Sequence, residues 1–235
     1  MGRRGWMLGV VALAGCQAAP MPMPMPMPVL SLGPDRTGYM LFAAPIVDQT
    51  AALFQAGLNK LLDLQATQIH VAINSGGGSV KAAEAMIATM DRVHAERGVT
   101  FTTHNVGIVG SAACYVFLAG QQRVSLPKAM FMFHQQGMMA ASGGIISGQA
   151  LQEAADQVKQ NDRVFLAMLK SRTKIPDAEA LSFVHRTVIL TADEAKRDGI
   201  IQSVGNFDVP PGATVFGIKP KINPASPVTP GTPQG

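Results

Sequence analysis

Cysteine is almost absent from this chain of 235 residues, which contains only Cys16 and Cys114. If Cys16 is lipidated, Cys114 has no partner cysteine and no intrachain disulfide can form. Charged residues are scarce too, at 14% of the chain, and aromatic residues make up 6%. Because the 19 lysines and arginines are scattered and aromatics are few, the formal net charge of +4 predicts no nucleic-acid partner.

Long apolar runs are missing as well. No run would span a membrane as a mature helix, although 47% of the residues are apolar, as in a globular domain with a sizeable core. The histidines show no metal-ligand spacing, and the glycine turn at residues 74–79 lacks the signatures of phosphate and dinucleotide loops. We therefore expect no cofactor and no metal.

The first sixteen residues carry export features. Arg3 and Arg4 precede a short apolar segment, which Leu13-Ala14-Gly15-Cys16 closes. This ending resembles the bacterial lipobox, which implies lipidation of Cys16. Because Gln17 gives no inner-membrane retention signal, the resemblance favours the outer membrane of a bacterial envelope, facing the periplasm. An ordinary signal peptide, or a misjudged start codon, with an incidental cysteine is the alternative.

Composition divides the chain into four parts. Met and Pro alternate from Met21 to Pro28, which predicts a semi-rigid spacer because alternate prolines hold the backbone extended. The parts are a signal peptide at 1–15, a lipid anchor and spacer at 16–36, a folded domain at 37–209, and a Pro/Gly-rich disordered tail at 210–235.

Within the folded domain, strand and helix patterns alternate. Short apolar or alternating segments predict strands at 38–44, 68–74, 99–104, around Val124 and at 130–133. Helical stripes predict helices at 48–64, 80–94, 147–171 and 176–185. A Thr191–Glu194 capping box predicts a further short helix. This order indicates a parallel sheet with right-handed crossovers, which places ligands at the carboxyl ends of its strands.

Ser111 is the candidate nucleophile. It follows Gly110, lies among small residues and opens a short apolar helix, whose N-terminal N–H groups would face a developing negative charge. The turn at 74–79 lies upstream between a strand and a helix, so it can bring further N–H groups to the same place. His134 follows the next strand and is a candidate general base. These are the groups that acyl transfer requires.

These motifs, in this order, resemble the proteolytic subunit of the Clp protease, a serine peptidase of the crotonase-like superfamily. The resemblance covers roughly residues 38–205 and rests on four segments, at 73–80, 107–120, 132–135 and 189–199. It implies an α/β fold, a ββα spiral with a protruding handle helix that begins near Gly148. It also implies that Ser111 is the nucleophile, His134 the base, and the N–H groups of Gly78 and Ala112 the oxyanion hole.

The third catalytic position departs from the family. Counting back from Ile189 places the family's aspartate on Thr187, which can accept a hydrogen bond from an imidazole but cannot stabilise an imidazolium by charge. Losing that charge can lower kcat about 10⁴-fold. Asp162 or Asp193 could substitute in space.

The sequence thus predicts a serine endopeptidase that cleaves peptides or unfolded proteins without ATP, assembled as a homo-oligomeric ring. Three alternatives stay open. The first is a catalytically impaired scaffold or peptide-binding protein, because of Thr187. The second is a crotonase-like acyl-CoA enzyme, and the third is a serine–lysine peptidase with Lys159 as base.

Overall fold

The computed structural model describes residues 30–135, 137 and 147–219. The expected signal peptide, Cys16 and the Met-Pro spacer lie outside the described residues. Within these ranges no helix is long and apolar enough to cross a membrane.

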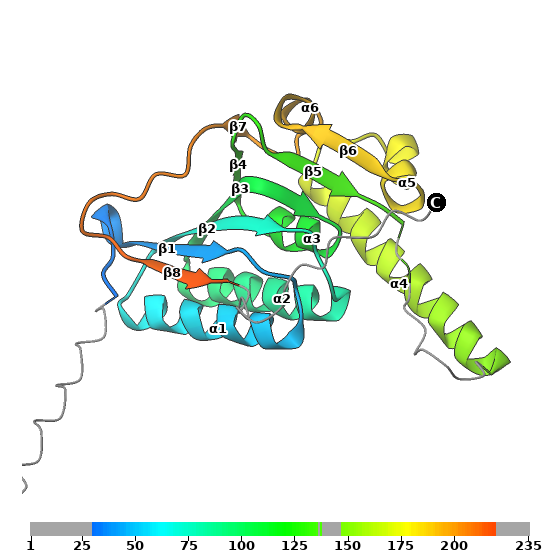
Figure 1. The fold of residues 1–235 in the computed structure, drawn as a ribbon, viewed down its shortest axis with the longest axis horizontal. Coiled ribbons are helices and arrows are strands. Elements are labelled where there is room, and N and C mark those ends of the chain that lie inside the picture. The colour runs from blue at the N-terminus through cyan, green and yellow to red at the C-terminus, as the bar shows by residue number, and fades with distance from the viewer. Residues whose placement is uncertain (1–29, 136, 138–146, 220–235) are drawn as a thin grey trace, which may run out of the picture.

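The centre of the molecule is an eight-stranded sheet with the order β6-β5-β3-β2-β1-β8, to which β4 and β7 are attached beside β3 (Figure 1). All its neighbouring strands run parallel except β5 and β6. The strands are β1 (Thr37–Phe42), β2 (Gln68–Ser75), β3 (Thr100–Gly110), β4 (Gln122–Ser125), β5 (Met130–Phe133), β6 (Val188–Thr191), β7 (Ser203–Val204) and β8 (Val215–Ile218). The predicted mixed α/β architecture is confirmed.

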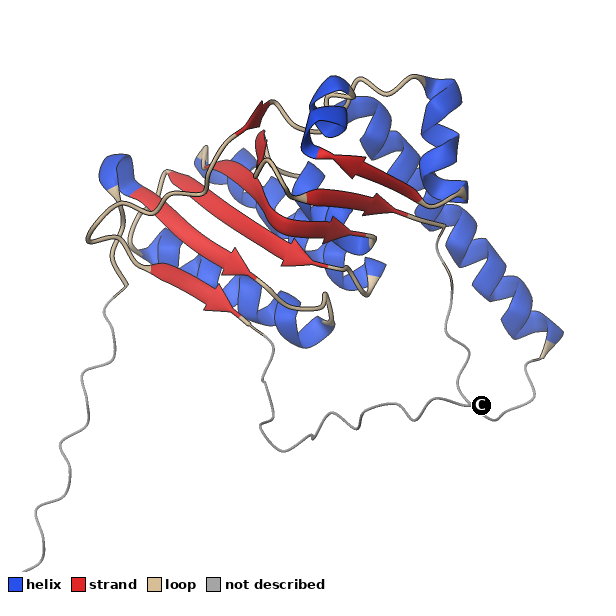
Figure 2. Ribbon diagram, turned by 45° about the horizontal axis from the view of Figure 1, so that its top comes forward, coloured by secondary structure: helices blue, strands red, loops and turns tan. Residues whose placement is uncertain are grey.

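Helices α1 and α2 cover one face of the sheet, and α4 extends well beyond its edge (Figures 1 and 2). The helices are η1 (Pro34–Arg36), α1 (Asp48–Asp63), α2 (Val80–Arg97), α3 (Ala112–Leu118), α4 (Gly148–Arg172), α5 (Asp177–His185) and α6 (Ala192–Arg197). Only Phe165 and Leu169 of α4 are buried, so its first half projects as the expected handle.

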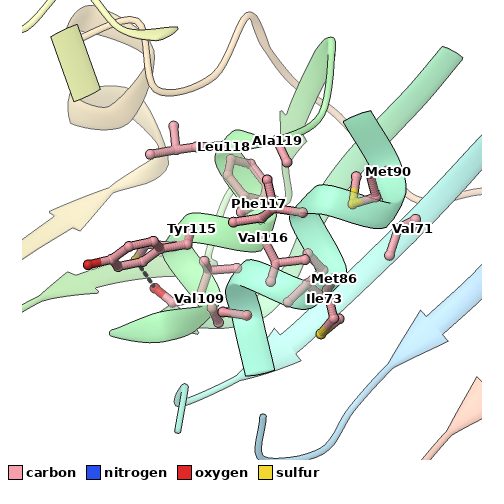
Figure 3. Close-up of a cluster of buried hydrophobic side chains, with 14 of the residues drawn as sticks. Val71, Ile73, Met86, Met90, Val109, Tyr115, Val116, Phe117, Leu118 and Ala119 are labelled. Carbon is pink, nitrogen blue, oxygen red and sulfur yellow. Dashed lines mark hydrogen bonds between the residues drawn. The ribbon is translucent and has the colours of Figure 1, made fainter. Parts of the chain in front are cut away.

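Helix α3 lies at the centre of the core, and all seven of its residues are buried. It packs on α2 and on the sheet, where Val116 and Phe117 lie among Val71, Met86 and Met90 (Figure 3). A helix buried on every side is held rigidly, because protein interiors are close-packed. The residue that precedes α3 is therefore fixed in place.

Cys114 is part of this packing. Its side chain is 1% exposed, and its Sγ lies 3.4 Å from the carbonyl oxygen of Val109. Burial raises the pKa of the thiol, which keeps it protonated. The structure therefore gives Cys114 a packing role.

Strand β3 is longer than predicted, since it runs through Gly110 and does not end near His104. Two asparagine side chains satisfy its irregular backbone: the N–H of Gly107 donates to Oδ1 of Asn105, and that of Ile108 to Oδ1 of Asn74, each at 3.1 Å. The glycines that suggested a turn instead permit close approach, because a Cβ on Gly107 would lie 2.6 Å from Oδ1 of Asn74.

The predicted tail begins too early. Residues 215–218 form β8, which pairs in parallel with β1, and the ring of Phe216 packs against Gly57 of α1. The N–H of Ser31 donates to Oγ1 of Thr214 at 2.7 Å, so the folded part also begins before residue 37. The described fold thus includes a short edge element on either side of the predicted domain, and each is stabilised by the other and by β1.

A buried histidine pair lies on β2 and β3. His104 is 6% exposed, and its Nε2 lies 3.1 Å from Nδ1 of His70, with the ring of Phe207 edge-on to it. Burial, and then the neighbouring His70, lower the pKa of His104 to about 4. Protonation of this pair therefore opposes folding.

We expect the protein to lose stability as the pH falls. The unfolded chain binds the His104 proton near pH 6.5 and the folded chain only near pH 4, so unfolding takes up a proton between these values. The free energy of unfolding should fall by up to about 3 kcal/mol between pH 7.5 and 4. Urea titrations of the wild type and His104→Gln would measure this, and equal pH slopes would contradict it.

Candidate active site

Three loops meet at the carboxyl ends of adjacent strands. Gly110 is paired with Met132 in the β3–β5 ladder, and Val109 with Ser75 in the β2–β3 ladder. The residues that follow these strands are therefore neighbours: the glycine turn after β2, Ser111 after β3, and His134 after β5. The glycine turn after β2 therefore lies beside the junction of Gly110 and Ser111, as the sequence indicated.

Ser111 occupies a strained backbone conformation at the junction of β3 and α3. Its φ of 52° and ψ of −125° are unusual for a residue with a side chain. Its N–H donates to the carbonyl oxygen of Met132 at 2.8 Å, so this donor is not free for a substrate. The N–H of Ala112, the first residue of α3, has no acceptor within its helix. Of these two N–H groups, that of Ala112 is therefore the candidate oxyanion donor.

The glycine turn after β2 presses on this junction. A Cβ on Gly77 would lie 2.6 Å from the Gly110 carbonyl oxygen, 2.7 Å from Cβ of Ser111 and 2.8 Å from the N of Ala112. The turn is held by Ile46, whose N–H donates to Gly77 and whose carbonyl accepts from Ser79, at 2.9 and 2.8 Å. Within the described ranges this bridge does not use the N–H of Gly78. Because Gly77 approaches Ala112 so closely, the two predicted oxyanion donors lie on touching backbone segments.

His134 has a defined tautomer. Its Nδ1 lies 2.7 Å from the carbonyl oxygen of Gln135. Because a carbonyl oxygen can only accept, Nδ1 of the neutral ring carries the proton and Nε2 carries the lone pair that can accept one. His134 and Ser111 line the same small cavity, with Ala112, Tyr115 and Phe133 beside them. Over the described ranges their side chains share no hydrogen bond, which is common before substrate binds.

Thr187 lies one residue beyond the last pair of the β5–β6 ladder, Phe133 with Val188, and so opposite His134. This is the position at which the family resemblance placed an aspartate. Its side chain is exposed and does not line the cavity. Within the part of the chain that the structure describes, Thr187 makes no hydrogen bond to His134.

The other predicted substitutes are separated by the structure. Asp162 of α4 lines the cavity with Ser111 and His134. Asp193 is exposed in the first turn of α6 and does not line it. Lys159 is exposed and pairs with Asp156 at 3.4 Å, so the serine–lysine alternative has no geometric support. Residues 30–135, 137 and 147–219 contain no cluster of three or more metal-ligating side chains.

A mixed α/β sheet with a serine, a histidine and a glycine turn at its strand ends is the arrangement of a serine hydrolase. The family model for Clp protease matches residues 35–207, and the chain belongs to this family. Its members are serine peptidases, as the resemblance implied.

Curated relatives agree. The chain is 29% identical over 168 residues to the ATP-dependent Clp protease proteolytic subunit 1 of Cutibacterium acnes, covering 70% of this chain and 75% of the relative. It is 36% identical over 140 residues to the subunit of that name from Rhodococcus jostii, covering 58% and 60%. A solved structure of a ClpP1 mutant from Listeria monocytogenes has the same fold, with a TM-score of 0.60 and 23% identity over 74% of this chain and 92% of that one.

One feature of the site was missed by sequence reasoning. The carbonyl oxygen of Gln135 fixes the His134 tautomer, and no sequence signal shows this because every residue has such an oxygen.

Proposed function

We propose that this chain is a serine endopeptidase that hydrolyses peptides or unfolded proteins through an acyl-enzyme. The observation that carries the proposal is that one cavity is lined both by a strained Ser111 and by a His134 whose Nε2 can accept a proton. Family membership supports the same chemistry.

The reaction follows from these positions. His134 Nε2 takes the proton of Ser111 as Oγ attacks the peptide carbonyl carbon. The N–H groups of Gly78 and Ala112 stabilise the negative oxygen that forms. The imidazolium then donates its proton to the leaving amine, and water, activated by the same ring, hydrolyses the ester.

We also propose where the protein acts and that it forms a homo-oligomer. The lipobox-like segment supports anchoring through Cys16 in the envelope, where hydrolysis would proceed without ATP. The exposed first half of α4, including Leu151 at 64% exposure, supports a homo-oligomer in which handle helices pack on one another.

Labelling with a fluorophosphonate, which reacts with activated serines, tests the function. The assembled wild type should be labelled, and both Ser111→Ala and His134→Ala should lose labelling at least about 10³-fold, because the nucleophile and its base act as a unit. An unlabelled wild-type oligomer would contradict the peptidase proposal and favour the scaffold that the uncharged Thr187 suggests.

The same labelling in whole cells, followed by fractionation, tests the location. The labelled band should partition into the detergent-extracted envelope fraction. A band confined to the cytosol would contradict the lipid anchor and leave the chemistry intact.

A further inference from the structure

Asp162 is held beside the two catalytic candidates by aromatic packing. It lies one turn before Phe165 on α4, and the ring of Phe165 stacks on Tyr115 at 4.3 Å and lies 6.0 Å from Phe133. Tyr115 is four residues after Ser111, and Phe133 is directly before His134. Packing of α4 on both thus brings Asp162 into the cavity that Ser111 and His134 line.

Within the described part of the chain, the Asp162 carboxylate lacks a hydrogen bond that a buried structural group would normally have. Its Oδ1 is buried and has no hydrogen-bond partner among the residues that the structure describes. Burial raises the pKa of Asp162, and the charge of His185 at the end of α5 opposes this rise. A buried carboxylate oxygen without a partner costs stability, so it is seldom retained for packing alone.

Several titratable groups surround Asp162. His134 lines the same cavity, and His185, whose charge acts on the carboxylate, lies at the end of α5 and does not line it. On its own helix, Lys159 is paired with Asp156, and the side chain of Arg163 is exposed. Of the residues that line the cavity, His134 is the one that gains a positive charge during the proposed reaction.

A triad aspartate has two tasks, which are to fix the tautomer of the histidine and to stabilise the imidazolium. Here the carbonyl oxygen of Gln135 performs the first at 2.7 Å. A neutral carbonyl cannot supply the negative charge for the second, and neither can Thr187.

We propose that Asp162 is a positioning residue for the peptidase reaction, whose carboxylate stabilises the His134 imidazolium across the cavity in place of an aspartate at position 187. The inference rests on the proposed function. In the resting structure the carboxylate does not hydrogen-bond the ring, so it acts through charge. The two tasks of one aspartate are thus divided between a backbone carbonyl and a side chain on the handle helix.

Peptide hydrolysis and fluorophosphonate labelling by Asp162→Asn test the inference. Because Gln135 still fixes the tautomer, we expect kcat to fall about 10²-fold, less than the roughly 10⁴-fold known for a full triad. The acid limb of the pH profile should move to lower pH, because the imidazolium loses a stabilising charge. Asp162→Glu should recover part of the rate.

Two matched controls accompany it. Asp156→Asn removes the same charge from an exposed position of α4, and Thr187→Ala removes the side chain at the family's aspartate position. Both should keep the wild-type rate within about two-fold. A Thr187→Ala loss larger than that of Asp162→Asn would overturn the inference. So would an Asp162→Asn effect limited to KM for lysine- or arginine-containing substrates, which would instead make Asp162 a cation subsite.

A second readout does not need activity. In the Ser111→Ala protein with ¹³C-labelled histidine, the NMR titration midpoint of His134 should fall when Asp162 becomes asparagine. An unchanged midpoint would overturn the inference whether or not the enzyme is active. Absent labelling of the wild type, by contrast, would overturn the peptidase proposal alone, so the two failures are distinguishable.

Discussion

Replacement of Gly77 with alanine is expected to abolish the reaction of Ser111 with a fluorophosphonate while leaving the sheet folded. Gly77 has a φ of 101°, and its added Cβ would lie 2.6 Å from the carbonyl oxygen of Gly110 and 2.7 Å from Cβ of Ser111. These atoms belong to the backbone and to a Cβ, so no side-chain rotation can relieve the clash. The glycine turn must move away from the nucleophile and carry the N–H of Gly78 with it.

The expected loss is large because the turn supplies an oxyanion donor. Removing one such donor lowers kcat about 10²–10³-fold, and a displaced turn also disturbs the backbone of Ser111. Labelling kinetics would measure the loss, and far-UV circular dichroism would show that the fold remains. Labelling of Gly77→Ala at the wild-type rate would contradict a role for this turn in the site.

Gly76→Ala is the matched control in the same turn. Among the residues that the structure describes, a Cβ on Gly76 would meet nothing within 4 Å, and its φ is not in the positive range. We expect labelling within about two-fold of the wild type, because the added methyl group is unopposed. Neighbouring glycines should therefore differ by orders of magnitude.

The strand-end positions could be predicted because they follow from short-range patterns. A strand that ends in glycines before a helix places its next residue at the carboxyl edge of a parallel sheet, and this was enough to bring Ser111 and His134 together. The capping box at Thr191 could be predicted for the same reason, and the structure confirms it: Glu194 Oε2 accepts from the Thr191 N–H at 2.8 Å.

Short-range sequence patterns could not predict that Asp162 lies beside Ser111 and His134. It lies 28 residues after His134 on a mostly polar helix, and which face of that helix meets the site depends on the contacts of Phe165. Strand β8 was hidden for a similar reason, since Val215–Ile218 is short and its pairing partner β1 lies far away in the chain. The position of Asp162 and the formation of β8 both depend on long-range packing, which a local sequence pattern does not encode.

Replacement of Arg123 with methionine should cost the largest share of stability. Arg123 is 5% exposed, and its guanidinium donates to the carbonyl oxygens of Ile200, Gly120, Arg172 and Gly199, at 2.7, 3.0, 2.6 and 3.3 Å. Burial, and then the charge of Arg172, lower the pKa of the guanidinium. Methionine preserves much of the volume but leaves these four acceptors without their donors.

Each unsatisfied buried acceptor costs about 1–3 kcal/mol, so we expect the free energy of unfolding to fall by at least about 4 kcal/mol in urea titrations. Arg92→Met, at an exposed site on α2, is the control and should change it by less than about 0.5 kcal/mol. A loss under about 1 kcal/mol in Arg123→Met would show that water satisfies these carbonyls.

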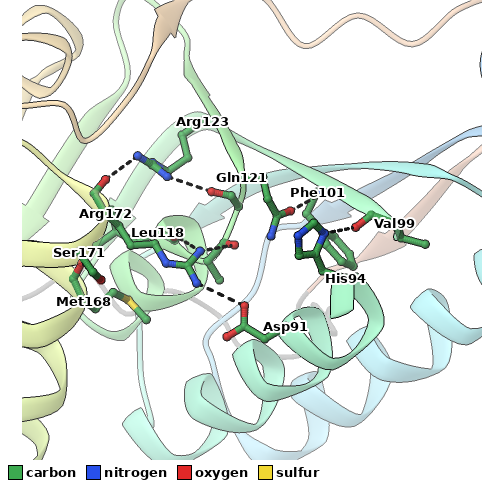
Figure 4. A network of polar contacts seen from close by, with 12 residues as sticks. Asp91, His94, Val99, Phe101, Leu118, Gln121, Arg123, Met168, Ser171 and Arg172 are labelled. Atoms are coloured by element: carbon green, nitrogen blue, oxygen red, sulfur yellow. Dashed lines mark hydrogen bonds and ion pairs between the residues drawn. The ribbon is translucent and has the colours of Figure 1, made fainter. Parts of the chain in front are cut away.

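The same variant should also weaken the active site. Arg172 donates to the carbonyl oxygens of Leu118 and Ala119 at 3.4 and 3.0 Å, so the two arginines together hold the C-terminal end of α3 against the end of α4 (Figure 4). The other end of α3 begins directly after Ser111, and α4 carries Asp162. We therefore expect slower fluorophosphonate labelling in Arg123→Met even under conditions in which it is fully folded. Unchanged labelling would show that the Tyr115–Phe165 contact alone keeps α4 in register with the nucleophile.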